Sequence, residues 1–155
     1  VMDSYFIIKL VHILSSTILF GTGIGSAFFM FMANRRKDIS AIYFVTRHVV
    51  IADFIFTTPS VIVQLVSGIF LIHLSGASFS DTWIMWGIIL YSFAGICWLP
   101  VVWMQIKMRD MAKHALTTKS DLPPLYWKYD RWWITLGSLA FPAIIIVFYL
   151  MVFKP

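Results

Sequence analysis

The sequence predicts an all-α integral membrane protein, folded as one four-helix bundle over residues 1–155. Four apolar stretches carry the prediction, at approximately 5–33, 49–72, 83–104 and 132–153. About 20 apolar residues at a rise of about 1.5 Å each cross a hydrocarbon core of about 30 Å. The composition agrees, with 60% hydrophobic, 17% aromatic and 12% charged residues. Because backbone amides in lipid must find partners within their own segment, we expect helices.

The expected helices run over about 5–33, 40–73, 83–114 and 126–153. The first is expected to be a retained helix, since it lacks the basic start and small-residue cleavage site of a signal peptide. Helical pattern continues from Ile39 through Val50, so the first two helices are expected to extend toward the cytoplasm. Pro59 predicts a kink in the second helix, between Thr57 and Ser60. The sequence around Pro123 predicts the break before the fourth.

Basic residues gather in the first and third connections, whereas the second, residues 74–82, has Asp81 and no Lys or Arg. The basic side chains here are Arg35, Arg36, Lys37, Arg47, Lys107, Arg109, Lys113, Lys119, Lys128 and Arg131. The positive-inside rule therefore puts both termini outside, in the periplasm of a bacterial inner (cytoplasmic) membrane. The net charge of +5 is explained by topology and contact with anionic lipid. No nucleic-acid partner is expected.

Polar side chains within the apolar stretches mark the inside of the bundle, because lipid does not satisfy them. Counting from the loops, which neighbouring antiparallel helices share, predicts two polar layers. The layer in the outer half comprises Lys9, His12, Gln64 and Tyr91. The layer in the inner half comprises Asp53, Gln105 and Arg109, with Asp130 and Arg131. Tryptophans near the ends of the stretches, including Trp133, are expected in the interfacial aromatic belt.

His12 is the deepest of the four histidines, about two turns inside the first apolar stretch. His114 is expected in solvent, His73 at the outer rim, and His48 beside Arg47 at the inner interface, where it suits an anionic head group or propionate. A buried neutral imidazole in a helical bundle is a standard haem ligand, so haem b is the first cofactor to consider. A second histidine at matching depth is missing. The alternative is a hydrogen-bonded core histidine.

Several segments resemble a bacterial family of small four-helix membrane proteins of unknown function, and the resemblance covers nearly the whole chain. They are residues 9–13 (Lys-Leu-Val-His-Ile), the basic turn that follows, Thr58-Pro59, Gly68, and residues 98–100 (Trp-Leu-Pro). The Lys-x-x-His-Ile start is also similar to the HemJ type of protoporphyrinogen oxidase and to the CopD type of copper-resistance membrane domain. HemJ proteins have a Trp-x-x-x-Lys segment in the third helix. The nearest segment here, residues 83–87, has no lysine.

The HemJ resemblance implies a haem-binding membrane oxidoreductase that converts protoporphyrinogen IX to protoporphyrin IX. Electrons would pass to a quinone or the respiratory chain. His12 would be the iron ligand or redox site, with Lys9 as its companion. Guanidinium groups suit propionate carboxylates, and the candidates are Arg47, Arg109 and Arg131. Asp53 would relay protons or pair with an arginine.

The rival hypothesis is a non-catalytic accessory subunit, or a carrier of a small molecule or copper. A copper site would combine His12 with Met30, Met32 or Met104, since thioethers suit Cu(I). The eight methionines are more simply explained as packing residues. Cys97 is the only cysteine and is expected to be a small core residue. A homo-oligomer is compatible with either hypothesis.

Overall fold

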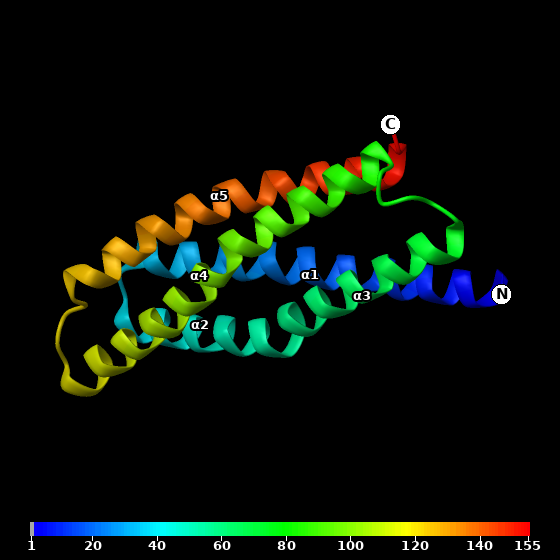
Figure 1. Ribbon diagram of the computed structural model, residues 1–155. Helices are drawn as coiled ribbons and strands as arrows, with labels where there is room; N and C mark the ends of the chain where they lie inside the picture. The colour runs from blue at the N-terminus through cyan, green and yellow to red at the C-terminus, as the bar shows by residue number, and fades with distance from the viewer. Residues whose placement is uncertain (1) are drawn as a thin grey trace.

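The computed structural model describes residues 2–155, and it is helical almost throughout (Figure 1). The elements are α1 (Met2–Arg36), α2 (Ile39–Ala52), η1 (Asp53–Thr57), α3 (Thr58–Ser75), α4 (Thr82–Thr118) and α5 (Pro124–Phe153). α2, η1 and α3 form one continuous second span. Four helices in the described chain are long and apolar enough to cross a membrane. The predicted all-α, four-span architecture is confirmed, and every helix is longer than predicted from hydropathy.

Local sequence explains where the helices begin and end. Asp38 caps α2, because its carboxylate accepts a hydrogen bond from the backbone N–H of Ser40 at 3.0 Å. Gly76 ends α3 in the left-handed conformation, with φ of 71°, where the absence of a Cβ removes the steric penalty. Pro124 begins α5, where a missing N–H leaves no intrahelical bond unmade. The break predicted around Pro123 is confirmed.

Pro59 changes the second span one turn before its own position. It has no N–H to offer to the carbonyl of Ile55, and its ring crowds that carbonyl. The chain responds with the five-residue π-helical turn η1, in which the N–H of Thr58 bonds to the carbonyl of Asp53. Asp53 and Thr57 are buried, while Phe54 and the two residues after it are exposed. The proline thus turns a carboxyl and a hydroxyl inward.

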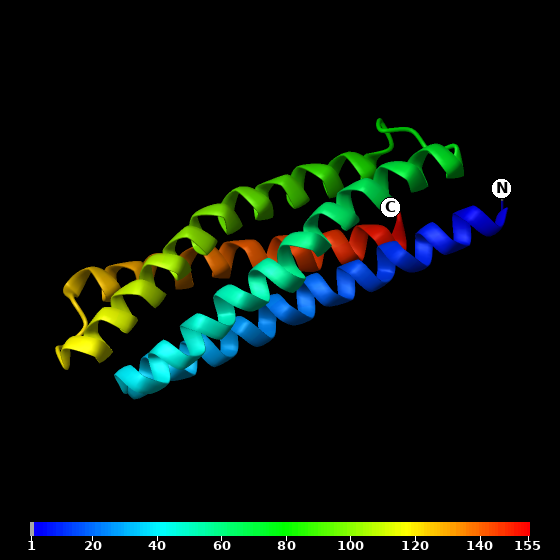
Figure 2. The same cartoon turned by 90° about the horizontal axis from the view of Figure 1, so that it is seen from below.

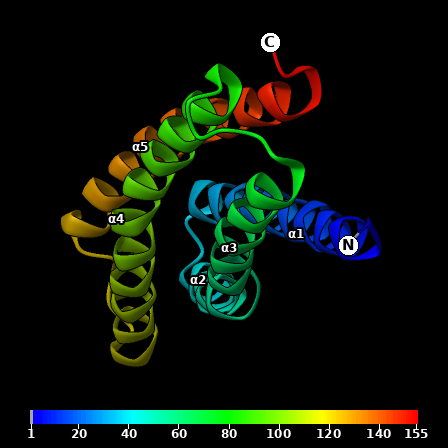
Figure 3. The same ribbon diagram turned by 45° about the vertical axis from the view of Figure 1, so that its right-hand side comes forward.

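The spans form two closely packed pairs. α4 packs along α5, and α1 packs along the second span, beside α3 (Figures 1 and 2). α2 joins the pairs by packing on α4, whereas α1 and α5 make few contacts with each other. Both termini and the α3–α4 connection lie at one end of the bundle (Figure 1). Viewed obliquely, α4 and α5 lie on one side of the molecule and the other helices on the opposite side (Figure 3).

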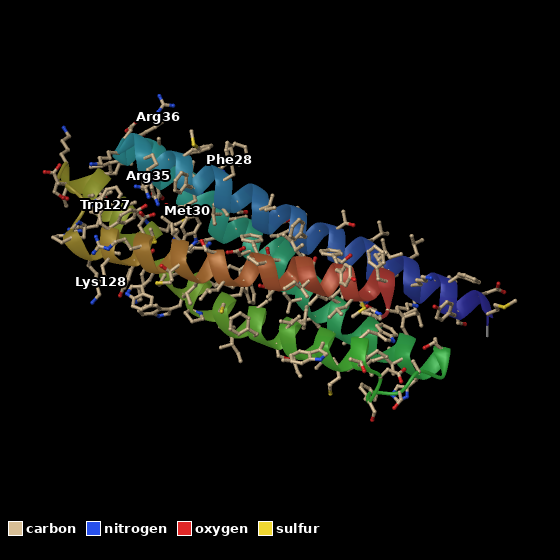
Figure 4. The ribbon with its side chains drawn as sticks, turned by 90° about the horizontal axis from the view of Figure 1, so that it is seen from above. Phe28, Met30, Arg35, Arg36, Trp127 and Lys128 are labelled. Atoms are coloured by element: carbon tan, nitrogen blue, oxygen red, sulfur yellow. The ribbon has the colours of Figure 1, made fainter. Side chains whose placement is uncertain are left out.

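The tight core lies at the end that carries the two basic connections. Its buried residues are Met30, Ala33, Ile42, Val49, Met104, Met108, Ala112, Tyr126 and Trp133. On α1, Phe28 is 59% exposed and points away from the bundle, while fully buried Met30 points into it (Figure 4). Large apolar side chains such as Phe28 face outward on every span. Such a surface suits lipid, which solvates apolar side chains as well as a protein core does.

Candidate functional site

A cavity of about 570 Å³ lies between the two helix pairs. All four spans line it: α1 between positions 19 and 31, the second span between 53 and 61, α4 between 91 and 105, and α5 between 133 and 144. Along α1 the lining therefore covers about 18 Å at about 1.5 Å per residue. Phe20, Trp98 and Phe141 supply much of its apolar wall. The cavity exists because the two pairs pack closely only where α2 meets α4, while α1 and α5 make few contacts with each other.

Four side chains from three spans make the cavity's polar end. Thr57 donates a hydrogen bond to Asp53 Oδ1 at 3.1 Å. When the Gln105 amide is turned so that both its oxygen and its nitrogen have partners, Gln105 donates to Asp53 Oδ2 and accepts from the indole Nε1 of Trp133 at 3.0 Å. Asp53 is 4% exposed and Trp133 is 6% exposed. This group, Asp53, Thr57, Gln105 and Trp133, is called the carboxyl site below.

Trp133 determines the direction of these hydrogen bonds. An indole N–H can only donate, so the Gln105 oxygen must face Trp133 and the Gln105 amino group must face Asp53. Both carboxyl oxygens of Asp53 therefore accept from neutral donors. The prediction that Trp133 belongs to an interfacial belt is wrong. Trp133 lies inside the bundle because the first turns of α5 pack against α1 and α4 in the core.

His12 occupies a second polar layer, outside the cavity and between α1 and α3. Its Nδ1 lies 2.8 Å from Ser67 Oγ, and its Nε2 lies 3.0 Å from the amide nitrogen of Gln64. Ser15 donates to the Gln64 oxygen at 2.5 Å. A Cβ on Gly68 would lie 3.3 Å from His12 Cε1, so the imidazole packs directly on the backbone of α3. This group is called the histidine layer below.

The histidine layer contains only part of the predicted outer layer. His12 and Gln64 come together, as loop counting predicted. Lys9 is exposed, and its ammonium lies 5.6 Å from the ring centroid of Tyr5. Tyr91 instead donates to the carbonyl of Val61 at 2.8 Å and lines the cavity. Equal depth did not bring these two side chains to His12, because they leave their helices at different angles around the helix axis.

The predicted inner layer is also divided. Asp53 and Gln105 meet, whereas Arg109 pairs with its neighbour Asp110 at 2.9 Å on the surface of α4. Arg131 is exposed on α5 and does not join them. Their guanidinium groups remain in contact with water or head groups, which avoids the cost of burying a charge. The prediction that Arg109 and Arg131 share a layer with Asp53 is wrong.

Asp130 belongs to a separate buried cluster between α1 and α5. Asn34 donates to Asp130 Oδ1 at 2.8 Å, and Tyr126 donates to the Asn34 oxygen at 2.5 Å. The guanidinium group of Arg35, which is labelled in Figure 4, lies 3.5 Å from Asp130 Oδ2. The sequence analysis missed Asn34 and Tyr126. The spacing of Tyr126 and Asp130, four residues apart on one helix face, is the signal that could have found them.

The remaining predicted anchors lie on the outside of the bundle. Arg47 and His48 are exposed on α2, and His48 Nδ1 lies 2.7 Å from the carbonyl of Phe44 in its own helix. These positions are open to a head group, and they belong neither to the histidine layer nor to the cavity lining. Cys97 is buried in α4, as expected of a core residue.

The described residues form no ready-made site for either of the metals considered, haem iron or copper. The described residues contain no group of three or more His, Cys, Asp or Glu side chains that could hold a metal ion. His12 and Met30 are 18 residues apart on one helix, which is about 27 Å at about 1.5 Å per residue. Met30 and Met104 instead pack together in the core. The residues around His12 also do not fit a haem as they stand, because both imidazole nitrogens are hydrogen-bonded and Gly68 covers the ring edge.

Comparison with known proteins identifies the family. A family described as "Predicted integral membrane protein (DUF2269)" matches residues 6–155. No curated protein and no solved structure matches the chain. The similarity to HemJ and CopD proteins therefore stays a prediction. Because the match covers nearly the whole sequence, this chain belongs to the DUF2269 family of predicted integral membrane proteins.

Proposed function

We propose that this protein binds a lipophilic small molecule in the cavity between its helix pairs, and serves the membrane as a carrier or accessory subunit for it. The cavity is the single observation that carries the proposal. Its volume of about 570 Å³ is within the range of ligand pockets, which is roughly 300–1,000 Å³. An apolar wall with a few converging polar groups is also typical of such pockets. The carboxyl site supplies those groups.

Entry from the lipid is the natural route for such a ligand. The seam between α1 and α5 is loosely packed. Phe20 bridges it by edge-to-face contacts with Phe141 and Phe148, at centroid distances of 6.0 and 5.5 Å. Aromatic side chains that turn about χ1 open such a seam without unfolding either helix. A lipophilic molecule would then reach the cavity without crossing water.

A cavity-filling variant tests the proposal. Gly95 lines the cavity, and a Cβ added there meets no atom within 4 Å. Gly95→Leu should therefore fill the cavity while the helices keep their packing. Gly21→Leu is the matched control, because Gly21 also has open space around it and lies outside the lining.

The measurement is mass spectrometry of organic extracts from purified protein. We expect a lipophilic compound that is retained by the wild type and by Gly21→Leu, and that Gly95→Leu loses. Equal retention by all three proteins would show that the compound binds on the outer surface, and would contradict the proposal.

The second candidate is the haem-binding oxidoreductase predicted from the sequence, with quinone as electron acceptor. One observation favours it. In the present orientation of the Gln64 amide, His12 Nε2 is an acceptor and Nδ1–H donates to Ser67. A metal-ligating histidine commonly has its non-coordinating nitrogen held by a hydrogen bond in this way, although Nε2 of His12 is itself bonded to Gln64 in this structure. To hold haem iron, His12 would first have to give up its hydrogen bond to Gln64 and move away from Gly68, and bound haem would supply the electron transfer.

Absorption spectroscopy tests the haem candidate. Protein purified from haem-replete cells should show a Soret band, and His12→Ala should lose it while His114→Ala keeps it. A colourless, folded wild type would exclude this candidate, and the binding proposal would be unaffected.

The orientation in the membrane is proposed from the distribution of Lys and Arg. Both basic connections are at one end of the bundle, and that end would face the bacterial cytoplasm. Reporters fused after Pro155 or inserted near Gly76 should then be exported, and one inserted near Ser120 should stay inside. A cytoplasmic reporter after Pro155 would reverse the orientation.

A further inference from the structure

The cavity holds a carboxyl group without a cationic partner. Within residues 2–155, no Lys, Arg or His side chain is part of the cavity lining. Tyr91 is the only other titratable side chain there, and it is bonded to the Val61 carbonyl. The ion pairs of the described chain use other carboxylates, those of Asp110 and Asp130. Residues 2–155 therefore provide no counter-charge for Asp53.

The carboxyl site is nevertheless built to accept hydrogen bonds at Asp53. Thr57 donates to one oxygen, and Gln105, oriented by Trp133, donates to the other. Two neutral donors favour the ionised form of a carboxyl group without cancelling its charge. A charge in an apolar bundle is costly unless it takes up a proton or pairs with a cation. A ligand can supply that cation.

The walls of the cavity suit the same kind of ligand. Phe20, Phe31, Tyr91, Trp98, Trp133 and Phe141 line it. The faces of aromatic rings attract organic cations, and the attraction is stronger where the contact is desolvated. The same rings accommodate a hydrocarbon body, which a small hydrated metal ion does not have.

We propose that the ligand of this cavity is a lipophilic organic cation, such as a protonated or quaternary amine, whose charge pairs with Asp53 and whose body lies against the aromatic lining. This inference rests on the proposed small-molecule binding function and narrows its ligand class. A neutral lipophile, a quinone included, would use the same space without needing the carboxylate. Charge selection therefore distinguishes the two ligand classes.

The test compares two probes of nearly the same shape, cationic methyltriphenylphosphonium and neutral triphenylphosphine oxide. Binding of each is measured by calorimetry with the full chain in phosphatidylcholine nanodiscs, and empty nanodiscs correct for partitioning. We expect the cation to bind the wild type about tenfold or more tightly than the neutral probe. Asp53→Asn should remove this preference by weakening the cation alone. Asp110→Asn, which deletes a carboxylate outside the cavity, should keep it.

The outcomes separate this inference from the proposal on which it rests. Equal affinity of the two probes for the wild type would overturn the charge selection, while a loss of both in Gly95→Leu would still support cavity binding. If neither probe binds the wild type, or if Gly95→Leu binds both unchanged, both proposals fail. The wild-type comparison decides the question even if Asp53→Asn does not fold.

Discussion

The histidine layer and the carboxyl site are both polar groups inside the bundle, yet one is closed and the other is open. Gln64 and Asp53 lie 11 residues apart on the second span, which is about 16 Å at about 1.5 Å per residue. At His12, α1 packs so closely on α3 that the imidazole touches Gly68. At Asp53, the helix pairs separate and leave the cavity. The difference shows that depth alone does not define a functional site, because the distance to the facing helix decides whether space remains for a ligand.

The two regions also use hydrogen bonds differently. In the histidine layer, donors and acceptors come from α1 and α3 and join those two helices. In the carboxyl site, Thr57 of the second span and Gln105 of α4 donate to one carboxyl group that also faces the cavity, and Trp133 of α5 orients Gln105. We therefore expect substitutions in the first region to affect stability most, and substitutions in the second to affect binding.

His12→Ala should have the largest effect on stability. It removes the hydrogen bonds to Ser67 and Gln64 and leaves a void beside Gly68. We expect the free energy of unfolding to fall by about 1–3 kcal/mol, measured by denaturation in mixed micelles. His73→Ala, an exposed control near the end of α3, should change it little. Equal effects of the two substitutions would show that the histidine layer does not hold α1 and α3 together.

Trp133→Phe should affect both stability and binding. It keeps the aromatic ring and removes the N–H that orients Gln105. We expect a loss of about 1–2 kcal/mol in the free energy of unfolding, because the Gln105 oxygen loses its donor. The amide can then turn, so the preference for a cationic probe should also weaken. An unchanged preference would mean that the Gln105 amide holds its orientation without Trp133.

A pair of glycine substitutions compares the closed and open regions directly. Gly68→Ala puts a Cβ 3.3 Å from His12 Cε1, so the imidazole must shift and the melting temperature should fall, with a cost of about 1 kcal/mol. Gly137 lines the cavity, and the Cβ that Gly137→Ala adds meets no atom within 4 Å. The substitution should be neutral or stabilise by about 0.5 kcal/mol, because alanine favours helix. A larger loss of stability from Gly137→Ala than from Gly68→Ala would contradict the conclusion that the histidine layer is closely packed and the cavity is open.

Asp53→Asn should have the smallest effect on stability. The amide keeps a polar group at the position, and a carboxyl group without a cationic partner is removed from the bundle interior. We expect the free energy of unfolding to change by less than about 1 kcal/mol. Thermal denaturation in detergent would measure it. A large destabilisation would show that the carboxylate has an essential structural role.

Loop counting predicted the meeting of His12 with Gln64 and of Asp53 with Gln105, because antiparallel helices joined by a short loop reach equal depths. Loop counting failed for residues whose partners depend on the direction in which the side chain leaves the helix. Tyr91 has the expected depth and faces the cavity, and Arg109 faces outward to Asp110. Trp133 was assigned to the interface from its position near a segment end, although packing of α5 turns it inward. Hydropathy gives depth and carries little information about this rotation.

The sequence by itself determined the class of protein, the four spans, the local signals that end them and the presence of a disturbance near Pro59, although the disturbed turn, Asp53–Thr57, lies before the predicted position between Thr57 and Ser60. These features depend on residues that are close together in the chain: apolar runs, a capping aspartate, a left-handed glycine and a missing proline N–H. Only the tertiary structure decided that His12 is enclosed while Asp53 faces a cavity. That difference depends on the distance between two helix pairs, α1 with α3 and α4 with α5. Many packing contacts between residues far apart in the chain set this distance together.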